Sequence, residues 1–327
     1  MKIAVTGVSG HIGSCLTREL LKNDDNQIRA LIHSSRKGLE KQPLECIEGD
    51  LSNIESLEKL CHGTDVVFHL AAQIAIDRKS GKEVLKTNVE GTKNLLEVCF
   101  RQGVSRVIHF SSIHALDVKP SDQIMDESRN LILKTNRTYE SSKAEGERIV
   151  LEFVKKGLNA IILNPTAVVG PFDYHRSYLG QALIKIFQNK LPVLVPGGYN
   201  WVDVRDVVQA AIASINRGRT GDRYILSGQW LNLKDLSEMI SSISGHKTPH
   251  AVVPLFIAYL GLPFIRFISQ WKGEHPLYTR DSLSILKEAH RNISNKKAKM
   301  ELGFNPRPLS ETLSDTFTWY KQQGLVV

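Results

Sequence analysis

Three glycines within the first thirteen residues constrain this chain more than any other feature. Gly7, Gly10 and Gly13 directly follow the apolar segment 2–6 and open a helical pattern. In such a turn the first glycine permits a tight bend, the second lets backbone approach a ligand, and the third lets the helix pack on the strand. The turn therefore predicts a cradle for a nucleotide pyrophosphate at a helix N-terminus, with Ser9, His11 and Ile12 among the contacts. A tight turn without a ligand is the alternative.

The first half of the 327-residue chain alternates short apolar runs with helical patterns, as a parallel sheet requires. We expect an α/β fold, a doubly wound Rossmann sheet in residues 1–165, and a smaller substrate-binding lobe in 166–327 with some elements returning to the sheet. Predicted strands are 3–6, 28–32, 45–48, 66–70, 106–110 and 160–163, and predicted helices are 12–22, 54–61, 83–102 and 137–156. After Pro165 we expect shorter elements at 204–216, 223–226, 234–244, 281–289 and 310–323.

The end of the second predicted strand bears on the choice of dinucleotide. NAD sites usually carry an acid about 20 residues past the glycine turn. Here the sequence has no carboxylate at that position and offers His33, Ser34, Arg36 and Lys37 instead. Hydroxyls and cations suit a 2′-phosphate, so NADP is favoured over NAD as the cofactor. The alternative is that these cations are ordinary loop charges.

Two later strand ends are also expected to contact the cofactor. Asp50, followed by Leu51, is placed to accept a hydrogen bond from the adenine amino group, or else to cap the helix that follows. Leu70, Ala71 and Ala72 end the fourth strand, where small residues let backbone lie against a ribose. His69, just before them, is expected to be a strand residue and not a ligand.

Tyr139 and Lys143 lie one helical turn apart in a predicted helix. A free phenol has a pKa near 10, and an ammonium one turn away is expected to lower it, which suits proton transfer to or from a carbonyl substrate. Ser112 comes just after the fifth strand and is predicted to position the substrate oxygen, with Ser111 nearer the cofactor. A surface contact between the phenol and the ammonium is the alternative.

Composition narrows the possible partners and locations. A net charge of +8 favours anionic ligands, but the basic residues are spread out, so nucleic acid is not an expected partner. The four cysteines have no metal-binding spacing, and we expect free, buried or partly buried thiols in the cytoplasm, and no metal site. No cleavable leader is expected before the first strand. The apolar segment 252–268 predicts a buried lid or a pair of core helices, with membrane-surface contact as the lesser alternative and no stable membrane anchor.

These residues resemble the extended short-chain dehydrogenase/reductase family, also called the NAD-dependent epimerase/dehydratase family. Within it the chain is most similar to the dihydroflavonol-4-reductase-like branch. The resemblance implies that Ser112, Tyr139 and Lys143 form a catalytic triad and that Asn88 lies near the active-site backbone. It further implies that Pro165, Ala167 and Val168 line the nicotinamide, and that helices 83–102 and 137–156 form a homodimer interface. It covers most of the chain and rests on segments 6–13, 49–51, 69–72, 88–92, 111–112, 139–143, 164–171 and 197–206.

Three functions stay open at this point. A reductase acting on the carbonyl or alcohol of a small molecule would use an apolar pocket, for which Tyr174, Tyr178, Tyr199 and Trp201 are candidates unless they are simply core residues. A nucleotide-sugar epimerase would need cations for a diphosphate, for which His175, Arg176, Arg205 and Arg223 are candidates. Arg205 is the weakest of these, since Asp203 or Asp206 is expected to pair with it. A dinucleotide-sensing protein without catalysis is disfavoured because the tyrosine and lysine pair is present.

Overall fold

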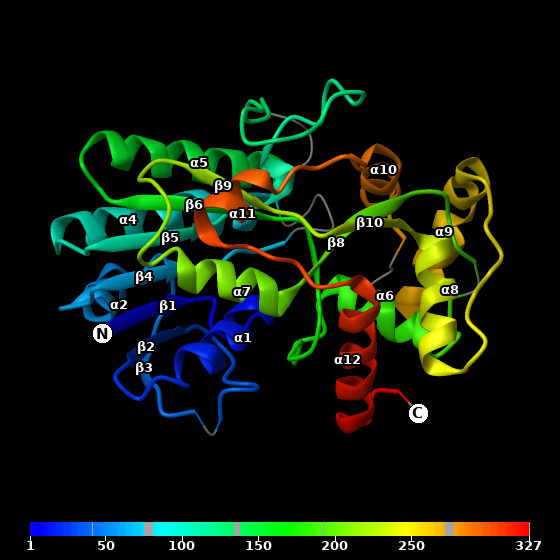
Figure 1. Cartoon of the computed structure of the whole chain (residues 1–327), viewed down its shortest axis with the longest axis horizontal. Coiled ribbons are helices and arrows are strands. Elements are labelled where there is room, and N and C mark those ends of the chain that lie inside the picture. Colours follow the sequence, from blue (N-terminus) through cyan, green and yellow to red (C-terminus); the bar gives the residue numbers. More distant parts are fainter. Residues whose placement is uncertain (41, 75–80, 134–137, 192, 272–277, 327) are drawn as a thin grey trace.

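The computed structural model describes residues 1–40, 42–74, 81–133, 138–191, 193–271 and 278–326, without the side chains of 266–270. One part of the molecule is a seven-stranded sheet with helices on both faces, and beside it lies a smaller lobe around a three-stranded sheet (Figure 1). The predicted fold class, an α/β doubly wound sheet with a smaller lobe, is confirmed.

The large sheet has the strand order β3-β2-β1-β4-β5-β6-β9, and every neighbouring pair is parallel. The order reverses beside β1, so a crevice opens at the carboxyl ends of β1 and β4, where doubly wound sheets bind their ligands. The strands are β1 (Lys2–Thr6), β2 (Gln27–Ile32), β3 (Glu45–Glu48), β4 (Val66–His69), β5 (Arg106–Phe110), β6 (Ala160–Pro165) and β9 (Arg223–Leu226).

Two groups of helices cover the two faces of this sheet. One apolar core lies under α1 (His11–Leu20), α7 (Val204–Ala213) and α11 (Lys296–Leu302), and the other under α2 (Ile54–Cys61), α4 (Gly91–Arg101) and α5 (Thr138–Lys155). The predicted helix 83–102 is divided in the structure into α3 (Gly81–Leu85), a π-helical segment η2 (Lys86–Glu90) and α4. Single π-helical turns often mark functional sites, and η2 carries Asn88.

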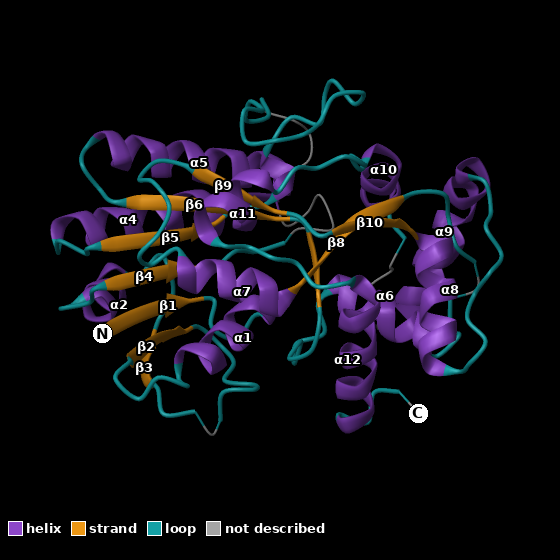
Figure 2. Cartoon of the chain, in the orientation of Figure 1, coloured by secondary structure: helices purple, strands orange, loops and turns teal. Residues whose placement is uncertain are grey.

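The smaller lobe has its own sheet and its own apolar core. Strand β8 (Gly198–Asp203) pairs in parallel with β7 (Ala167–Val169) and antiparallel with β10 (Gln229–Asn232). Figure 2 shows helices gathered around these strands, away from the large sheet. They are α6 (Tyr178–Phe187), α8 (Leu233–Ser244), α9 (Leu255–Trp271), α10 (Arg280–Glu288) and α12 (Leu309–Gln322).

The agreement with the predicted elements differs between the two parts. In the first half, the predicted bounds of β3, α2 and β5 match the structure, as do those of β9 later in the chain. The strands β7, β8 and β10 and the helix α6 were not predicted, because they are short and lie between prolines and glycines that obscure their periodicity.

The apolar segment 252–268 departs from its prediction. It is not a pair of helices, since α9 is one helix that continues through Pro263. It is not buried as a whole either, because Phe256, Leu260 and Phe264 are 65%, 77% and 75% exposed. Only the opposite side of α9 packs on the lobe, where Ala258 is buried. Among the described residues, none of the helices combines the length and the apolar character needed to cross a bilayer.

Candidate active site

The glycine turn after β1 has the close contacts that its sequence predicted. Gly7 has a φ of +71°, and a Cβ there would lie 2.6 Å from the backbone nitrogen of Ala71 at the end of β4. A Cβ on Gly13 would lie 2.2 Å from the carbonyl oxygen of Gly7. Both approaches are too close for any side chain, so β1, β4 and α1 can meet here only through glycine.

The N-terminus of α1 offers its first amide groups to the cavity. The helix begins after Gly10, which gives it no side-chain cap, and Gly10, His11, Ile12 and Gly13 line the cavity. Among the described atoms, a Cβ on Gly10 would have one close neighbour, the carbonyl oxygen of Gly7 at 3.2 Å. Uncapped N–H groups beside an open glycine suit a pyrophosphate, so the residues present fit a dinucleotide.

A single cavity of about 910 Å³ extends from this turn into the smaller lobe. Its cofactor side is lined by predicted residues from β1, α1, β4, β5, α5 and β6–β7. They are Gly7, Gly10, His11, Ile12, Gly13, Leu70, Ala72, Ser111, Ser112, Tyr139, Lys143, Pro165, Ala167 and Val168.

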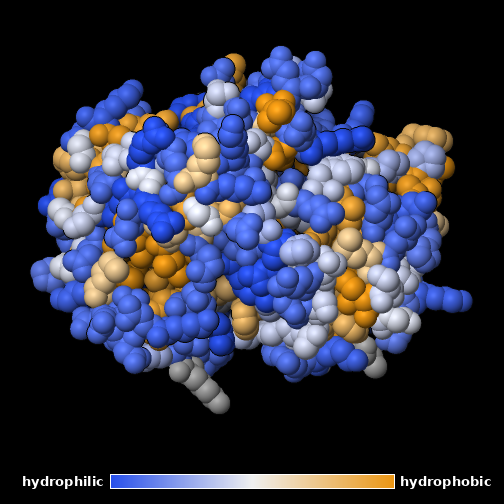
Figure 3. Space-filling view, viewed as in Figure 1, coloured by the Kyte–Doolittle hydropathy of each residue, from blue (hydrophilic) through white to orange (hydrophobic). Residues whose placement is uncertain are grey.

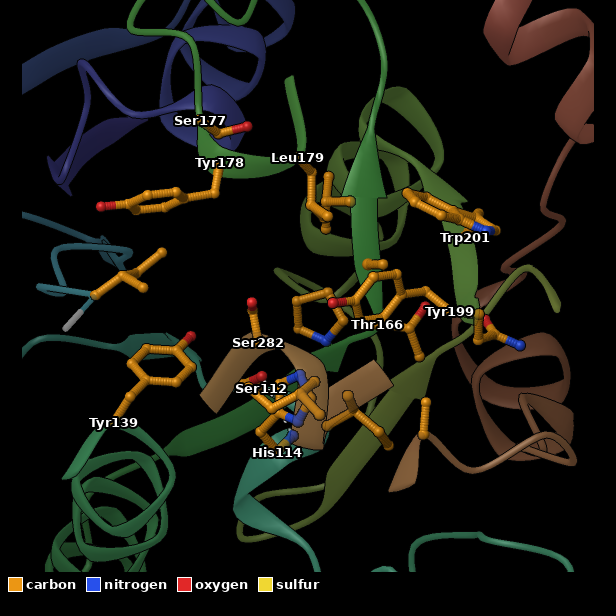
Figure 4. A pocket seen from close by; sticks show the side chains of 18 of the residues that line it. Ser112, His114, Tyr139, Thr166, Ser177, Tyr178, Leu179, Tyr199, Trp201 and Ser282 are labelled. Atoms are coloured by element: carbon orange, nitrogen blue, oxygen red, sulfur yellow. Dashed lines mark hydrogen bonds between the residues drawn. The ribbon is translucent and has the colours of Figure 1, made fainter. Parts of the chain in front are cut away.

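The three predicted catalytic residues are brought together at the middle of this cavity. Tyr139 and Lys143 come from α5, and Ser112 lies between β5 and the short helix η3 (Ile113–Ala115). In Figure 4 the Tyr139 phenol points into the cavity beside Ser112 and His114. The Ser112 oxygen accepts a hydrogen bond from the His114 backbone N–H at 3.2 Å, which fixes the serine at the start of η3.

The pKa of Tyr139 is set mainly by its burial and not by Lys143. The pKa of Tyr139 is raised because burial disfavours the phenolate, although a hydrogen bond with Ser112 partly offsets this effect. The predicted lowering of this pKa by Lys143 is therefore wrong for this arrangement of protein groups. A raised pKa keeps the proton on the phenol at neutral pH, where it is available for donation.

Lys143 is held between the sheet and its own helix. Its Nζ donates a hydrogen bond to the Phe110 carbonyl oxygen at 3.0 Å, at the end of β5. Burial lowers the pKa of Lys143 to about 8, against the attraction of the Glu147 carboxylate, which raises it. The lysine charge therefore titrates close to the working range of most enzymes.

Glu147 is a buried carboxylate that the sequence reasoning missed. It lies one turn beyond Lys143 on α5, its side chain is fully buried, and Arg223 of β9 lies 3.1 Å from it. Asn164 of β6 donates a hydrogen bond to its Oε1 at 2.5 Å. The signal that could have revealed it is the four-residue spacing from Tyr139 through Lys143 to Glu147, which places all three on one face of the helix.

Asn88, Leu51 and Ala71 were predicted to contact the cofactor, but none of them lines the cavity. Asn88 is buried, and its side-chain amide bonds to both backbone groups of Gln73 and to the Ser142 hydroxyl. Leu51 is buried in the core against Gly91, and Ala71 donates its backbone N–H to Thr6. These side chains support the cavity wall from behind.

Asp50 does not cap α2. Its Oδ1 accepts hydrogen bonds from the backbone N–H and the hydroxyl of Ser52, at 2.7 and 2.6 Å. The cap of α2 is Asn53, which accepts from the Ser56 N–H at 3.0 Å. The capping alternative is therefore wrong, and the contact of Asp50 with the adenine amino group stays a prediction. His69, in contrast, is buried in β4 with both ring nitrogens bonded to threonines, as expected of a strand residue.

The end of β2 is exposed, as a site for the outer part of a dinucleotide must be. His33, Ser34, Arg36 and Lys37 are exposed there and do not line the cavity. Ser9 of the glycine turn does not line it either, and it is half-buried. Arg36 lies 3.2 Å from the Glu48 carboxylate at the end of β3. Both side chains are at least half exposed, so this pair is weak and Arg36 can exchange partners at little cost.

The far half of the cavity is formed by side chains of the smaller lobe. Of the four predicted aromatic residues, Tyr178, Tyr199 and Trp201 line it (Figure 4). Tyr174 does not, because it accepts a hydrogen bond from Arg18 and packs on Trp319. The sequence reasoning also missed lining residues that no local pattern reveals. They include Leu183, Ile186, Leu194, Leu236, Tyr278, Ser282, Ile285, Leu286 and His290.

The arginines considered for a diphosphate do not reach this cavity. Arg205 pairs with Asp203 and Asp315, and Arg223 pairs with Glu147. Neither of these arginines lines the cavity, and Arg176 does not line it either. Of the four candidates, His175 alone lines the cavity. Asp206, the other predicted partner of Arg205, pairs with Arg307 instead. Among the described residues that line the cavity, Lys143 is the sole lysine or arginine, against the carboxylates of Asp117, Glu140, Asp173, Asp281 and Glu288. The described part of the chain also contains no cluster of His, Cys, Asp and Glu arranged to hold a metal ion.

A doubly wound sheet, a glycine cradle and a buried tyrosine beside a lysine define a dinucleotide-dependent class of enzyme, and the comparisons with known proteins agree. The profile of the NAD dependent epimerase/dehydratase family matches residues 3–227. The chain is 30% identical over 330 residues to a putative dihydroflavonol 4-reductase from Synechocystis, covering 98% of this chain and 95% of that protein. It is 28% identical over 332 residues to sterol demethylase protein B from Methylococcus capsulatus, covering 100% of both.

Solved structures show the same fold over nearly the whole chain. The crystal structure of gox2253 is similar with a TM-score of 0.84 at 31% identity, covering 99% of each chain. UDP-glucuronic acid 4-epimerase from Bacillus cereus, solved in complex with NAD, has a TM-score of 0.77 at 21% identity, covering 98% and 97%. The protein therefore belongs to the NAD-dependent epimerase/dehydratase family. It is an oxidoreductase of the extended short-chain dehydrogenase/reductase type, which transfers hydride with a nicotinamide dinucleotide.

Proposed function

We propose that this enzyme reduces the carbonyl group of a small, largely apolar molecule, and that its preferred cofactor is NADP. The observation that carries this proposal is the lining of the substrate half of the cavity. Its walls are leucine, isoleucine and aromatic side chains, and its described charged groups are mostly carboxylates. A nucleotide sugar would bring a diphosphate against those carboxylates with Lys143 as its one lysine or arginine partner among the described residues.

The proposed roles follow from the geometry of the three residues. Tyr139 is the proton donor to the developing alkoxide, because its raised pKa keeps it protonated until the substrate oxygen becomes basic. Ser112 donates a hydrogen bond to that oxygen and stabilises its negative charge. Lys143 supplies positive charge beside the cofactor ribose and the phenol. The dinucleotide supplies the hydride when it is bound.

A substrate panel tests the proposal directly. The purified enzyme is mixed with NADPH and with apolar ketones and aldehydes of increasing size, and in parallel with nucleotide-diphosphate sugars. We expect stoichiometric oxidation of the cofactor with members of the first group. Interconversion of a nucleotide sugar without net oxidation of the cofactor would establish the epimerase function instead.

The cofactor preference rests on the exposed groups at the end of β2. A 2′-phosphate there would draw Arg36 away from Glu48 and gain a charge-assisted hydrogen bond. We expect Arg36→Ala to raise the KM for NADPH about tenfold and to leave the KM for NADH unchanged. A wild-type enzyme that prefers NADH would overturn this part of the proposal.

We further propose a homodimer formed through α4 and α5, and a cytoplasmic location. The resemblance to the family supports the dimer, and Phe100 of α4 is 43% exposed at that surface. The four cysteines are free, as expected in a reducing compartment. Light scattering at micromolar concentration tests the dimer, and a monomer mass would contradict it.

A further inference from the structure

Helix α9 presents an apolar face that nothing in the described structure covers. Phe256, Leu260 and Phe264 are spaced four residues apart, so they form one stripe along the helix, and all three are more than 60% exposed. Trp271, at the end of the helix, is 84% exposed. Apolar side chains gather at the upper right of Figure 3, over the region where Figure 1 places α9. Stripes of this kind on soluble proteins commonly mark interaction sites.

The other side of α9 connects this face to the substrate cavity. Ala258 belongs to the same apolar core as Leu236 and Leu286, and both of these leucines line the cavity. Tyr278, which also lines the cavity, follows α9 in the chain and donates a hydrogen bond to the Val193 carbonyl at 3.1 Å. Helices α8 and α10 supply the cavity wall through these two leucines, and α9 belongs to the same apolar core with its stripe on the outside.

The charges around α9 restrict what can cover it. Residues 246–271 contain Lys247 and Arg266 but no aspartate or glutamate. Lys247 is exposed, just before the helix. A second copy of the chain docked face to face would place these like charges against one another. A lipid surface with anionic headgroups is complementary both to the apolar stripe and to its cationic border.

We propose that α9 docks this enzyme reversibly on the surface of an anionic lipid bilayer. The helix lies in the plane of the interface, with Phe256, Leu260 and Phe264 among the acyl chains and Lys247 among the headgroups. Peripheral binding of this kind needs no spanning helix and is not a stable anchor. It brings the smaller lobe, which forms the far half of the cavity, to a membrane that dissolves apolar substrates, although the docking itself does not depend on the reaction.

Vesicle co-sedimentation of the full-length protein tests the proposal. The probes are vesicles of phosphatidylcholine alone and vesicles of phosphatidylcholine mixed with phosphatidylglycerol. The test variant is F256S/L260S/F264S. The matched control is I124S/L133S/M300S, which removes three side chains of similar exposure, 56%, 82% and 67%, from other elements. Circular dichroism and NADPH binding verify that both variants are folded.

We expect the wild type and the control to bind the anionic vesicles, more weakly as salt is raised, and the α9 variant to bind at least about 100-fold less. A blue shift of tryptophan fluorescence on binding, lost in Trp271→Phe, would place the helix end at the interface. Absence of wild-type binding, or equal binding by the α9 variant, would overturn the proposal. So would a lower oligomer mass for the α9 variant in light scattering, because the stripe would then be a contact between copies.

Discussion

The two halves of the cavity are built in different ways. The cofactor half consists mainly of backbone, where the glycine turn, the uncapped start of α1 and the carboxyl ends of parallel strands meet at one edge of the sheet. The substrate half consists of side chains that α6, β8, α8 and α10 bring together from segments far apart in the chain. A backbone-built site tolerates few changes and keeps one ligand, whereas a site built from side chains can change its ligand by substitution.

Tyr139 stands where the two halves meet, so its replacement should have the largest effect. We expect Tyr139→Phe to lower kcat about 1,000-fold because the proton donor is lost, with cofactor affinity unchanged. Tyr199→Phe, in the substrate half, is the control and should retain most of its activity. Steady-state kinetics and a cofactor titration check both variants. Near-normal turnover in Tyr139→Phe would show that Tyr139 is not the proton donor.

Gly13→Ala should disturb the cofactor half of the cavity directly. The new Cβ would lie 2.2 Å from the Gly7 carbonyl oxygen, so α1 must move away from the turn. We expect cofactor affinity to fall about 100-fold and the free energy of unfolding to fall by about 1–3 kcal/mol. Calorimetric titration and chemical denaturation measure the two effects. Gly261→Ala is the control, because its Cβ would meet nothing within 4 Å. Unchanged cofactor binding in Gly13→Ala would contradict the backbone-built cradle.

Glu147→Gln should shift the pH dependence of kcat/KM, and its effect on the rate at low pH should be smaller. The carboxylate raises the pKa of Lys143, which burial brings to about 8, so its removal lowers that pKa further. If the ammonium is the active form, the alkaline limb of kcat/KM moves to lower pH by about one unit. Glu145→Gln, an acid on the same helix paired with Arg148, is the matched control and should keep the wild-type profile. An unshifted limb in a folded Glu147→Gln enzyme would limit Glu147 to a structural role.

Leu286→Ala should produce the smallest effect and confine it to the substrate half. The side chain is buried and lines the cavity, so its truncation removes apolar contact with the substrate. We expect the KM for an apolar ketone to rise about tenfold, with no change in cofactor affinity. Leu302→Ala removes an equally buried leucine from α11, outside the cavity, and should lower stability without changing KM. A loss of cofactor binding in Leu286→Ala would show that the halves are not independent.

The residues that meet at the centre of the cavity were predictable from the sequence, but their electrostatics were not. The spacing of Tyr139 and Lys143 and the position of Ser112 after β5 predicted that the three residues lie close together, and all three line one cavity. The expected lowering of the Tyr139 pKa was wrong because burial raises this pKa by more than the hydrogen bond with Ser112 lowers it, and the extent of burial depends on the tertiary packing. Glu147 was overlooked for the same reason, since its partners Arg223 and Asn164 come from two later strands.

The sequence by itself determined the doubly wound sheet, the glycine cradle and the order of the serine, tyrosine and lysine, because strand periodicity, turn geometry and helical spacing are local properties. The tertiary structure alone decided which side chains line the far half of the cavity, which carboxylate lies next to Lys143 on its helix, and which face of α9 remains exposed. Those outcomes depend on how distant segments pack against one another, and the direction of a side chain is fixed only once its neighbours are in place.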